Sequence, residues 1–221
     1  MHTIAIISQK GGAGKTTLAV HLATAAAVDH VALLVDTDPQ ATASQWSAWR
    51  GGKDPEVVDC GAPSLLAGKL QKSQELGAEV VLIDTPPHAD AMARQAAKLA
   101  DLILVPCRPR AFDLAAIEAT SELVRSSGKP AFVVFNAGPP NAPLVYRDAA
   151  ELVREAFQIP IAPVTIPERA AFHHATASGR SAGELAADGK AAAEIDALWR
   201  WTRTQLYTST RRETQPAGSV P

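Results

Sequence analysis

The chain has 221 residues, of which 47% are hydrophobic and 20% are charged, and its formal net charge is −2. This length and balance suit one globular α/β domain with a single sizeable core. No apolar run approaches the roughly 18 residues that a membrane-spanning helix needs, so we expect no stable insertion into a membrane. The slightly negative net charge excludes general basicity as the basis of nucleic-acid binding, so any DNA contact must come from a local patch.

Apolar segments of strand length alternate with segments of helical periodicity along most of the chain. Continuous Val, Ile and Leu runs are typical of strands buried on both faces, as in a parallel sheet. The predicted strands are 3–8, 31–36, 56–60, 80–84, 102–106, 131–136 and a short one at 161–164. The predicted helices are 15–28, 40–50, 64–76, 89–99, 114–126, 143–157 and two more after Pro167. This alternation predicts a three-layer, doubly wound α/β fold with a mostly parallel sheet flanked by helices.

We expect residues 1–206 to form one domain, because no linker or shift in composition divides them. Residues 207–221 are rich in Thr, Ser, Arg and Pro and contain few apolar side chains. A segment of this composition buries too little apolar surface to offset the entropy lost on ordering, so a disordered tail is expected.

A glycine-rich loop follows the first predicted strand and leads directly into the first predicted helix. Its sequence is Lys10-Gly11-Gly12-Ala13-Gly14-Lys15-Thr16-Thr17. The backbone N–H groups of such a loop and of the helix N-terminus point at phosphate oxygens. Lys15 can reach the β- and γ-phosphates, and the Thr16 hydroxyl can ligate Mg²⁺. The sequence therefore predicts a P-loop that binds ATP and Mg²⁺.

Two acidic motifs are expected at the same edge of the sheet. The strand 80–84 ends in Asp84, a Walker B arrangement that brings one carboxylate near Mg²⁺. The strand 31–36 ends in Asp36, and Asp38 follows closely. Ligands of open α/β sheets bind beyond the carboxyl ends of the strands, so all three carboxylates should lie near the phosphates. Because Asp38 precedes a proline, a role as a helix N-cap stays open for it.

The loop departs from the usual template G-x-x-x-x-G-K-[ST], because Gln9 replaces the first glycine and Lys10 follows it. This form resembles the deviant Walker A motif of ParA/MinD-type ATPases. The segments 36–44 and 105–114 resemble those of the small ParA-family partition ATPases in particular, and the likeness extends over roughly residues 1–206.

The resemblance implies an ATP-bound sandwich homodimer in which Lys10 reaches the nucleotide of the partner subunit. It implies that Asp36 supports the metal shell together with Thr16 and Asp84. It also implies that Asp38 orients the attacking water, so that Lys10, Lys15 and Asp38 serve hydrolysis of ATP to ADP and phosphate.

For the adenine base, the resemblance implies a contact from Asn136 and a second one from the backbone around Pro167. Asn136 ends a predicted strand just before the turn at 138–140. Forming that turn is therefore an alternative role for its side chain.

The same resemblance implies a bacterial partition or positioning ATPase, cytoplasmic and associated with the nucleoid. Its ATP-bound dimer would bind nonspecific DNA, and a ParB-like or other cargo-bound adaptor would release it by stimulating hydrolysis. The cargo could be a plasmid, a chromosome or a protein cluster. The expected DNA contacts are Arg169, Arg180, Lys190, Arg200 and Arg203, for which solvated helix-face charges are the alternative.

Two other functions remain open from the sequence. A MinD-like, membrane-associated positioning ATPase would need a C-terminal amphipathic helix with a strong apolar face. A metabolic P-loop enzyme would show ATP turnover that depends on a small substrate, and no DNA binding. Arg108 and Arg110, in the loop after strand 102–106, have no role that the sequence assigns.

Overall fold

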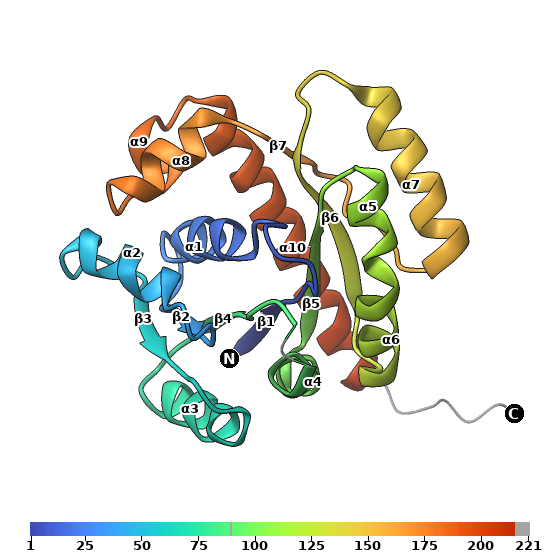
Figure 1. Ribbon diagram of the computed structural model, residues 1–221. Helices are drawn as coiled ribbons and strands as arrows, with labels where there is room; N and C mark the ends of the chain where they lie inside the picture. The colour runs from blue at the N-terminus through green and yellow to red at the C-terminus, as the bar shows by residue number, and fades with distance from the viewer. Residues whose placement is uncertain (89, 215–221) are drawn as a thin grey trace, which may run out of the picture.

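A computed structural model of the chain describes residues 1–88 and 90–214 (Figure 1). Its seven strands form one sheet in the order β3-β2-β4-β1-β5-β6-β7, with every neighbouring pair parallel. The strands are β1 His2–Ile6, β2 Ala32–Asp36, β3 Glu56–Asp59, β4 Val80–Asp84, β5 Leu102–Cys107, β6 Ala131–Gly138 and β7 Ile166–Pro167. The predicted fold class is confirmed.

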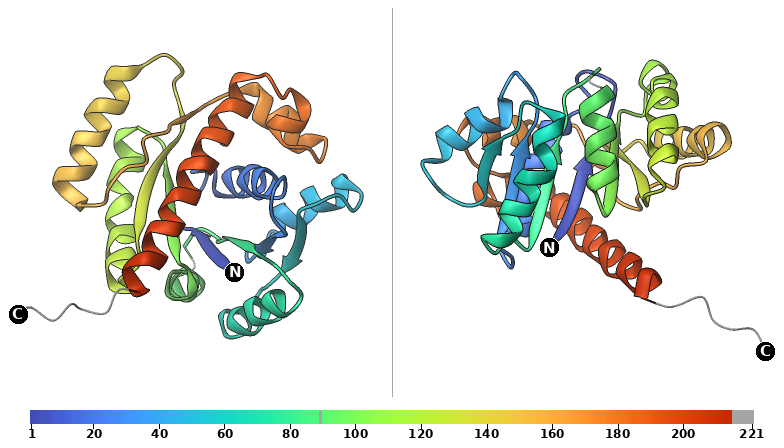
Figure 2. Two further views of the ribbon diagram at one scale, coloured as in Figure 1. Left: turned by 180° about the vertical axis from the view of Figure 1, so that it is seen from behind. Right: turned by 90° about the horizontal axis from the view of Figure 1, so that it is seen from below.

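Helices cover both faces of this sheet (Figures 1 and 2). On one face lie α3, α4, α6 and α7, and on the other lie α1, α2, α8 and α10. The helices are α1 Lys15–Ala26, α2 Thr42–Arg50, α3 Pro63–Glu75, α4 Asp90–Leu99, α5 Ala111–Ala115, α6 Ile117–Ser127, α7 Pro143–Phe157, α8 Ala170–Ala177, α9 Ala182–Leu185 and α10 Lys190–Thr214.

The alternation of side chains along the central strands builds the core on both faces. In and just after β1, Ala5 and Ile7 join the cluster under α4 and α6, while Ile4 and Ile6 join the cluster under α1 and α10. All four are buried. A strand that is covered on both sides has no polar face, which explains the continuous apolar runs in the sequence.

Two predicted elements lie differently. The segment 161–164 forms only an isolated bridge between Ile161 and Val133, and the last strand is β7, beside Asn136 and Gly138 of β6. Pro163 interrupts the predicted run, and a proline has no N–H to donate to a strand ladder. The single helix predicted at 114–126 is divided into α5 and α6.

The C-terminal helix α10 crosses one face of the sheet and extends past its edge (Figure 2). It runs to Thr214, so it continues beyond the domain boundary predicted at residue 206. Leu206, a residue of α10, is still buried in the core on this face of the sheet. Residues 215–221 of the predicted tail lie outside the described residues. Within the described ranges, no helix has the length and hydrophobicity that crossing a membrane requires.

Candidate functional site

The glycine-rich loop joins β1 to α1 at the carboxyl edge of the sheet (Figure 1). Gly14 is the N-cap of α1 and has a φ of 82°. A β-carbon at this position would collide with the amide nitrogen of Asn136, so both the backbone conformation and the available space require glycine. No side chain among the described residues caps α1, which leaves its first N–H groups open to an anion.

The side chain of Lys15 contacts the start of the same loop. Its side chain is buried, and its ammonium donates a hydrogen bond of 3.2 Å to the carbonyl of Lys10. Burial lowers the pKa of Lys15, while the charges of Asp84 and Asp38 act in the opposite direction. An anion bound in the loop would offset the cost of burying this ammonium.

The carboxylates of Asp36, Asp59 and Asp84 end three neighbouring strands in one row. Asp36 pairs in register with Asp84 on one side and with Asp59 on the other. The Thr16 hydroxyl donates a hydrogen bond of 2.6 Å to Asp84 Oδ2. The P-loop threonine and the last residue of β4 are thus in direct contact.

Asp84 fits a divalent cation. Its Oδ1 atom is buried and accepts no hydrogen bond from any described residue. Burial raises the pKa of Asp84 to about 7, and the charge of Asp36 acts in the same direction. Mg²⁺ takes one or two carboxylates plus phosphate and water, so the Asp84 carboxylate beside the Thr16 hydroxyl suits this ion.

Asp36 organises the loop between β2 and α2. Its Oδ1 accepts a bond of 3.1 Å from the N–H of Asp38, and its Oδ2 accepts one of 2.9 Å from the N–H of Ser44. The Ser44 hydroxyl lies within hydrogen-bonding distance of both Asp36 and Asp59. These contacts hold the Asp36 carboxylate in place beside Asp84.

Asp38 lies in the turn that follows. Its Oδ1 accepts a bond of 2.9 Å from the N–H of Gln40, so its side chain does support a local turn. The α2 helix begins later, at Thr42, after Ala41. Asp38 is also within electrostatic range of Lys15 and Asp84, and it lines a cavity of about 530 Å³ with residues that follow Asp84.

The ammonium of Lys10 is partly exposed and forms no ion pair or hydrogen bond with any described residue. Its backbone is fixed, because its carbonyl accepts from Lys15.

The side chain of Asn136 forms hydrogen bonds to the P-loop. Its amide nitrogen donates a bond of 2.8 Å to the carbonyl of Ala13 and a longer one of 3.4 Å to that of Gly14. Asn136 pairs with Ile166 of β7, and Gly138 pairs with Pro167. The two residues predicted to contact adenine thus lie on neighbouring strands, although the Asn136 amide serves the loop rather than the turn at 138–140.

Comparisons with known proteins agree with this geometry. Residues 4–182 match the family described as the CobQ/CobB/MinD/ParA nucleotide binding domain. The chain belongs to this family. Maintenance of carboxysome distribution protein A from Gloeobacter kilaueensis is 35% identical over 210 residues, which cover 89% of this chain and 95% of that protein.

Solved structures of family members share the fold. MinD from Aquifex aeolicus superposes with a TM-score of 0.74 at 19% identity, over 100% of this chain and 99% of that chain. An ATP complex of McdA from Cyanothece superposes with a TM-score of 0.71 at 18% identity, over 94% of this chain and 96% of that chain. The resemblance to ParA/MinD-type ATPases that the loop and the acidic motifs indicated is confirmed.

The five basic residues predicted to contact DNA differ in their surroundings. Three of them form ion pairs: Arg169 with Glu194, Arg200 with Asp196, and Arg203 with Asp29. Arg180 and Lys190 are exposed and pair with no carboxylate among the described residues. The positive charge of the predicted DNA contacts is therefore partly neutralised within the fold.

Sequence reasoning did not predict three contacts at this site. Asp59 extends the row of carboxylates and accepts a hydrogen bond from the Ser44 hydroxyl, and its position at the end of β3 was the available signal. Gln9 donates a bond of 2.7 Å to Asp90 at the start of α4, which ties the entrance of the P-loop to the segment after β4. Arg108 lies against the loop itself.

Proposed function

We propose that this chain is a positioning ATPase that hydrolyses ATP to ADP and phosphate and acts as an ATP-bound sandwich dimer. The observation that carries the proposal is the free ammonium of Lys10, anchored by its backbone to Lys15 at the edge of the nucleotide site. A cation held there without a partner in its own subunit suits a nucleotide bound by a second subunit.

Within one subunit, the roles follow the geometry. The N–H groups of the loop from Gly11 to Thr17 would bind the phosphates, with Lys15 as their main cationic partner. Thr16 and Asp84 would hold Mg²⁺, which supplies charge neutralisation at the phosphates when bound. Asp38 lines the adjoining cavity, where it would orient the attacking water.

For the partner surface, we propose nonspecific DNA, with Arg180 and Lys190 as the contacts that are free to bind phosphates. The position of Arg180 depends on α2, since its carbonyl accepts a bond of 3.1 Å from Trp46 Nε1. At Gly179 an added β-carbon would lie 2.6 Å from the backbone nitrogen of Arg50, so this segment packs tightly on α2. Because α2 also carries Ser44, this helix connects the nucleotide site to the segment that carries Arg180.

We propose that the cargo is a large protein assembly, as the name of the Gloeobacter kilaueensis relative states for the carboxysome. An adaptor on that cargo would stimulate hydrolysis and release the dimer from DNA. A plasmid or chromosome remains the alternative cargo. The protein would then be found in the cytoplasm on the nucleoid.

Fluorescence anisotropy with two unrelated DNA duplexes across a salt series tests this function. The parent protein should bind both duplexes equally with ATP and weakly with ADP. Replacing Arg180 and Lys190 by Ala removes about four phosphate contacts per dimer, so the log–log salt slope should shrink by about 3.6. Replacing Arg125 and Lys129, the same residue types on α6 and the loop after it, should leave the slope unchanged.

Light scattering in the same samples should show ATP-dependent dimers for the parent and for both double variants. DNA binding that is equal with ATP and ADP would contradict the proposed switch. Binding to anionic vesicles in place of DNA would favour a MinD-like function instead.

A further inference from the structure

We propose that Arg108 is a further nucleotide-binding residue, whose guanidinium contacts the phosphates of ATP or ADP bound to the P-loop of its own subunit. This inference rests on the proposed ATP binding and deepens it. It names a phosphate ligand outside the Walker motifs, on a loop to which the sequence assigns no role.

The sheet brings Arg108 to the P-loop. β5 lies beside β1, and the N–H of Ile7 donates a bond of 3.0 Å to the carbonyl of Leu104. Arg108 comes directly after the last residue of β5, as the glycine-rich loop comes after β1. Its Nη2 atom lies 3.9 Å from the place of a β-carbon on Gly12, so the guanidinium rests against the middle of the loop.

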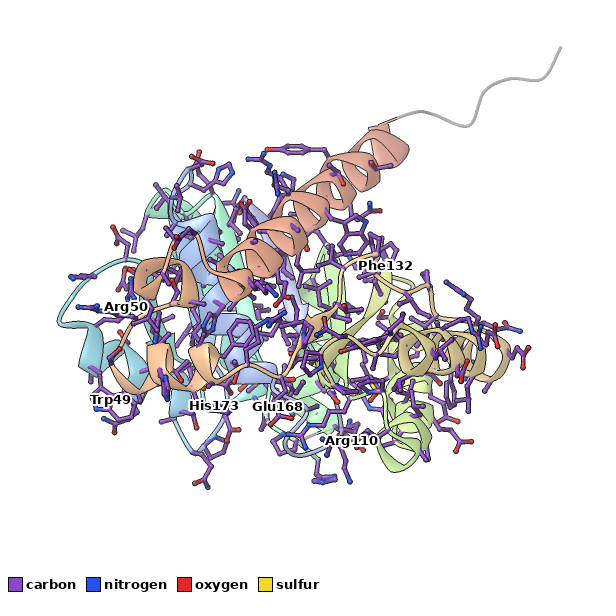
Figure 3. The ribbon with its side chains drawn as sticks, turned by 90° about the horizontal axis from the view of Figure 1, so that it is seen from above. Trp49, Arg50, Arg110, Phe132, Glu168 and His173 are labelled. Carbon is purple, nitrogen blue, oxygen red and sulfur yellow. The ribbon has the colours of Figure 1, made fainter. Side chains whose placement is uncertain are left out.

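The charge of Arg108 lacks a counter-ion. Its Nε atom is buried and donates to no group in the described part of the chain, and no described carboxylate forms an ion pair with it. The neighbouring Arg110 differs, since its Nη2 lies 3.8 Å from a carboxylate oxygen of Glu168, and both residues are labelled in Figure 3. A partly buried cation without a partner is unfavourable, and a phosphate in the adjacent loop would supply the missing charge.

The loop that carries Arg108 is held firmly. The Arg108 carbonyl accepts a bond of 2.8 Å from the N–H of Arg110 and one of 3.2 Å from the Cys107 thiol. Pro109 is buried against Gly138, where an added β-carbon would lie 2.6 Å from the proline ring. A guanidinium on a fixed backbone loses less freedom on binding, and its planar fork matches two phosphate oxygens at once.

Equilibrium titration with Mg²⁺–ADP and with a non-hydrolysable Mg²⁺–ATP analogue tests the proposal. Arg108→Ala should weaken the binding of both nucleotides by about 10- to 100-fold, the scale of hydrogen bonds to charged groups. Arg108→Lys keeps the positive charge but not the planar guanidinium, so its affinity for both nucleotides should fall less than that of Arg108→Ala. Arg110→Ala, a matched change in the same loop, should bind both nucleotides within about twofold of the parent. Circular dichroism and the unfolding temperature verify that each variant folds.

The possible outcomes separate the two proposals. If the parent binds neither nucleotide, the proposed function fails before Arg108 is tested. Parent-like affinity of Arg108→Ala for both nucleotides would overturn the role of Arg108 alone. Parent-like affinity combined with a loss of ATP-dependent dimers would also overturn it, because Arg108 would then act on the partner subunit.

Discussion

The Thr16 hydroxyl donates a hydrogen bond of 2.6 Å to Asp84 Oδ2, which joins the first turn of α1 to the end of β4. The other oxygen of this carboxylate is buried without a described partner, and burial raises the pKa of Asp84 to about 7. The ionised carboxylate is therefore unfavourable in the protein alone, and a bound cation would stabilise it. Folding stability is thus reduced where the metal is expected to bind.

Asp84→Asn should separate stability from metal binding. Without nucleotide or metal at pH 8, the variant should unfold at a higher temperature than the parent, because the buried charge is gone while an oxygen remains to accept from Thr16. Its ATP affinity should be the same with Mg²⁺ and with EDTA. Asp59→Asn, a change of the exposed acid in the same row, should keep the Mg²⁺ dependence of the parent. Calorimetry and nucleotide titration measure both effects, and a Mg²⁺-dependent Asp84→Asn variant would contradict the assignment.

Two substitutions at Asp38 distinguish its turn-supporting bond from a catalytic role. Asp38→Asn keeps an oxygen that can accept from the N–H of Gln40, and it removes the charge. If Asp38 orients the attacking water, both Asp38→Asn and Asp38→Ala should bind ATP and lower turnover by about 10²-fold or more. A phosphate-release assay measures this. If Asp38→Asn turns over ATP at the parent rate while Asp38→Ala is slow, Asp38 serves only to support the turn.

Alanine substitutions of the two loop lysines should impair different steps. Lys15→Ala should abolish ATP binding, because the phosphates lose the buried ammonium that the loop encloses. Lys10→Ala should bind ATP nearly as the parent does, since the Lys10 ammonium contacts no described residue of its own subunit. It should lose ATP-dependent dimers and turnover, as measured by light scattering and phosphate release. Normal dimers from Lys10→Ala would refute the deviant Walker interpretation.

Local patterns made most of the fold and the P-loop predictable. A glycine-rich loop between an apolar strand and a helix, and the acids Asp36 and Asp84 at strand ends, each lie within one short segment. The last strand was predicted at 161–164, where the apolar residues resemble a strand, but Pro163 lies within this segment and the strand forms at Ile166–Pro167 instead.

Contacts between distant segments could not be predicted in the same way. The bond from Asn136 to Ala13 joins β6 to the P-loop. The ion pair between Arg203 and Asp29 depends on the packing of α10 against α1, and it weakens the prediction that Arg203 contacts DNA. Pairing of this kind depends on tertiary packing, which one sequence does not encode in any local pattern.

The ion pair between Arg50 and Glu184 should have a larger coupling energy than the exposed ion pair between Arg147 and Asp148, because it is largely removed from water. The Arg50 guanidinium lies 2.8 Å from Glu184, donates a bond of 2.9 Å to the carbonyl of Gly179, and stacks 4.6 Å from the centre of the Trp46 ring. The side chain of Arg50 is 2% exposed and that of Glu184 is 34% exposed. Arg50→Met should lower the free energy of unfolding by about 2–4 kcal/mol, less than for a fully buried pair because Glu184 retains some water.

A double-mutant cycle of Arg50→Met and Glu184→Gln should give a coupling energy of about 1–3 kcal/mol by denaturant unfolding. The control cycle is Arg147→Met with Asp148→Asn, a pair at 2.9 Å whose side chains are both 63% exposed. Its coupling should be about 0–0.5 kcal/mol, since water and salt screen exposed charges. If the two cycles give equal coupling, burial does not strengthen the Arg50 pair. The attachment of Gly179 and Arg180 to α2 would then rest on the Arg50 bond to the Gly179 carbonyl, the Trp46 bond and close packing.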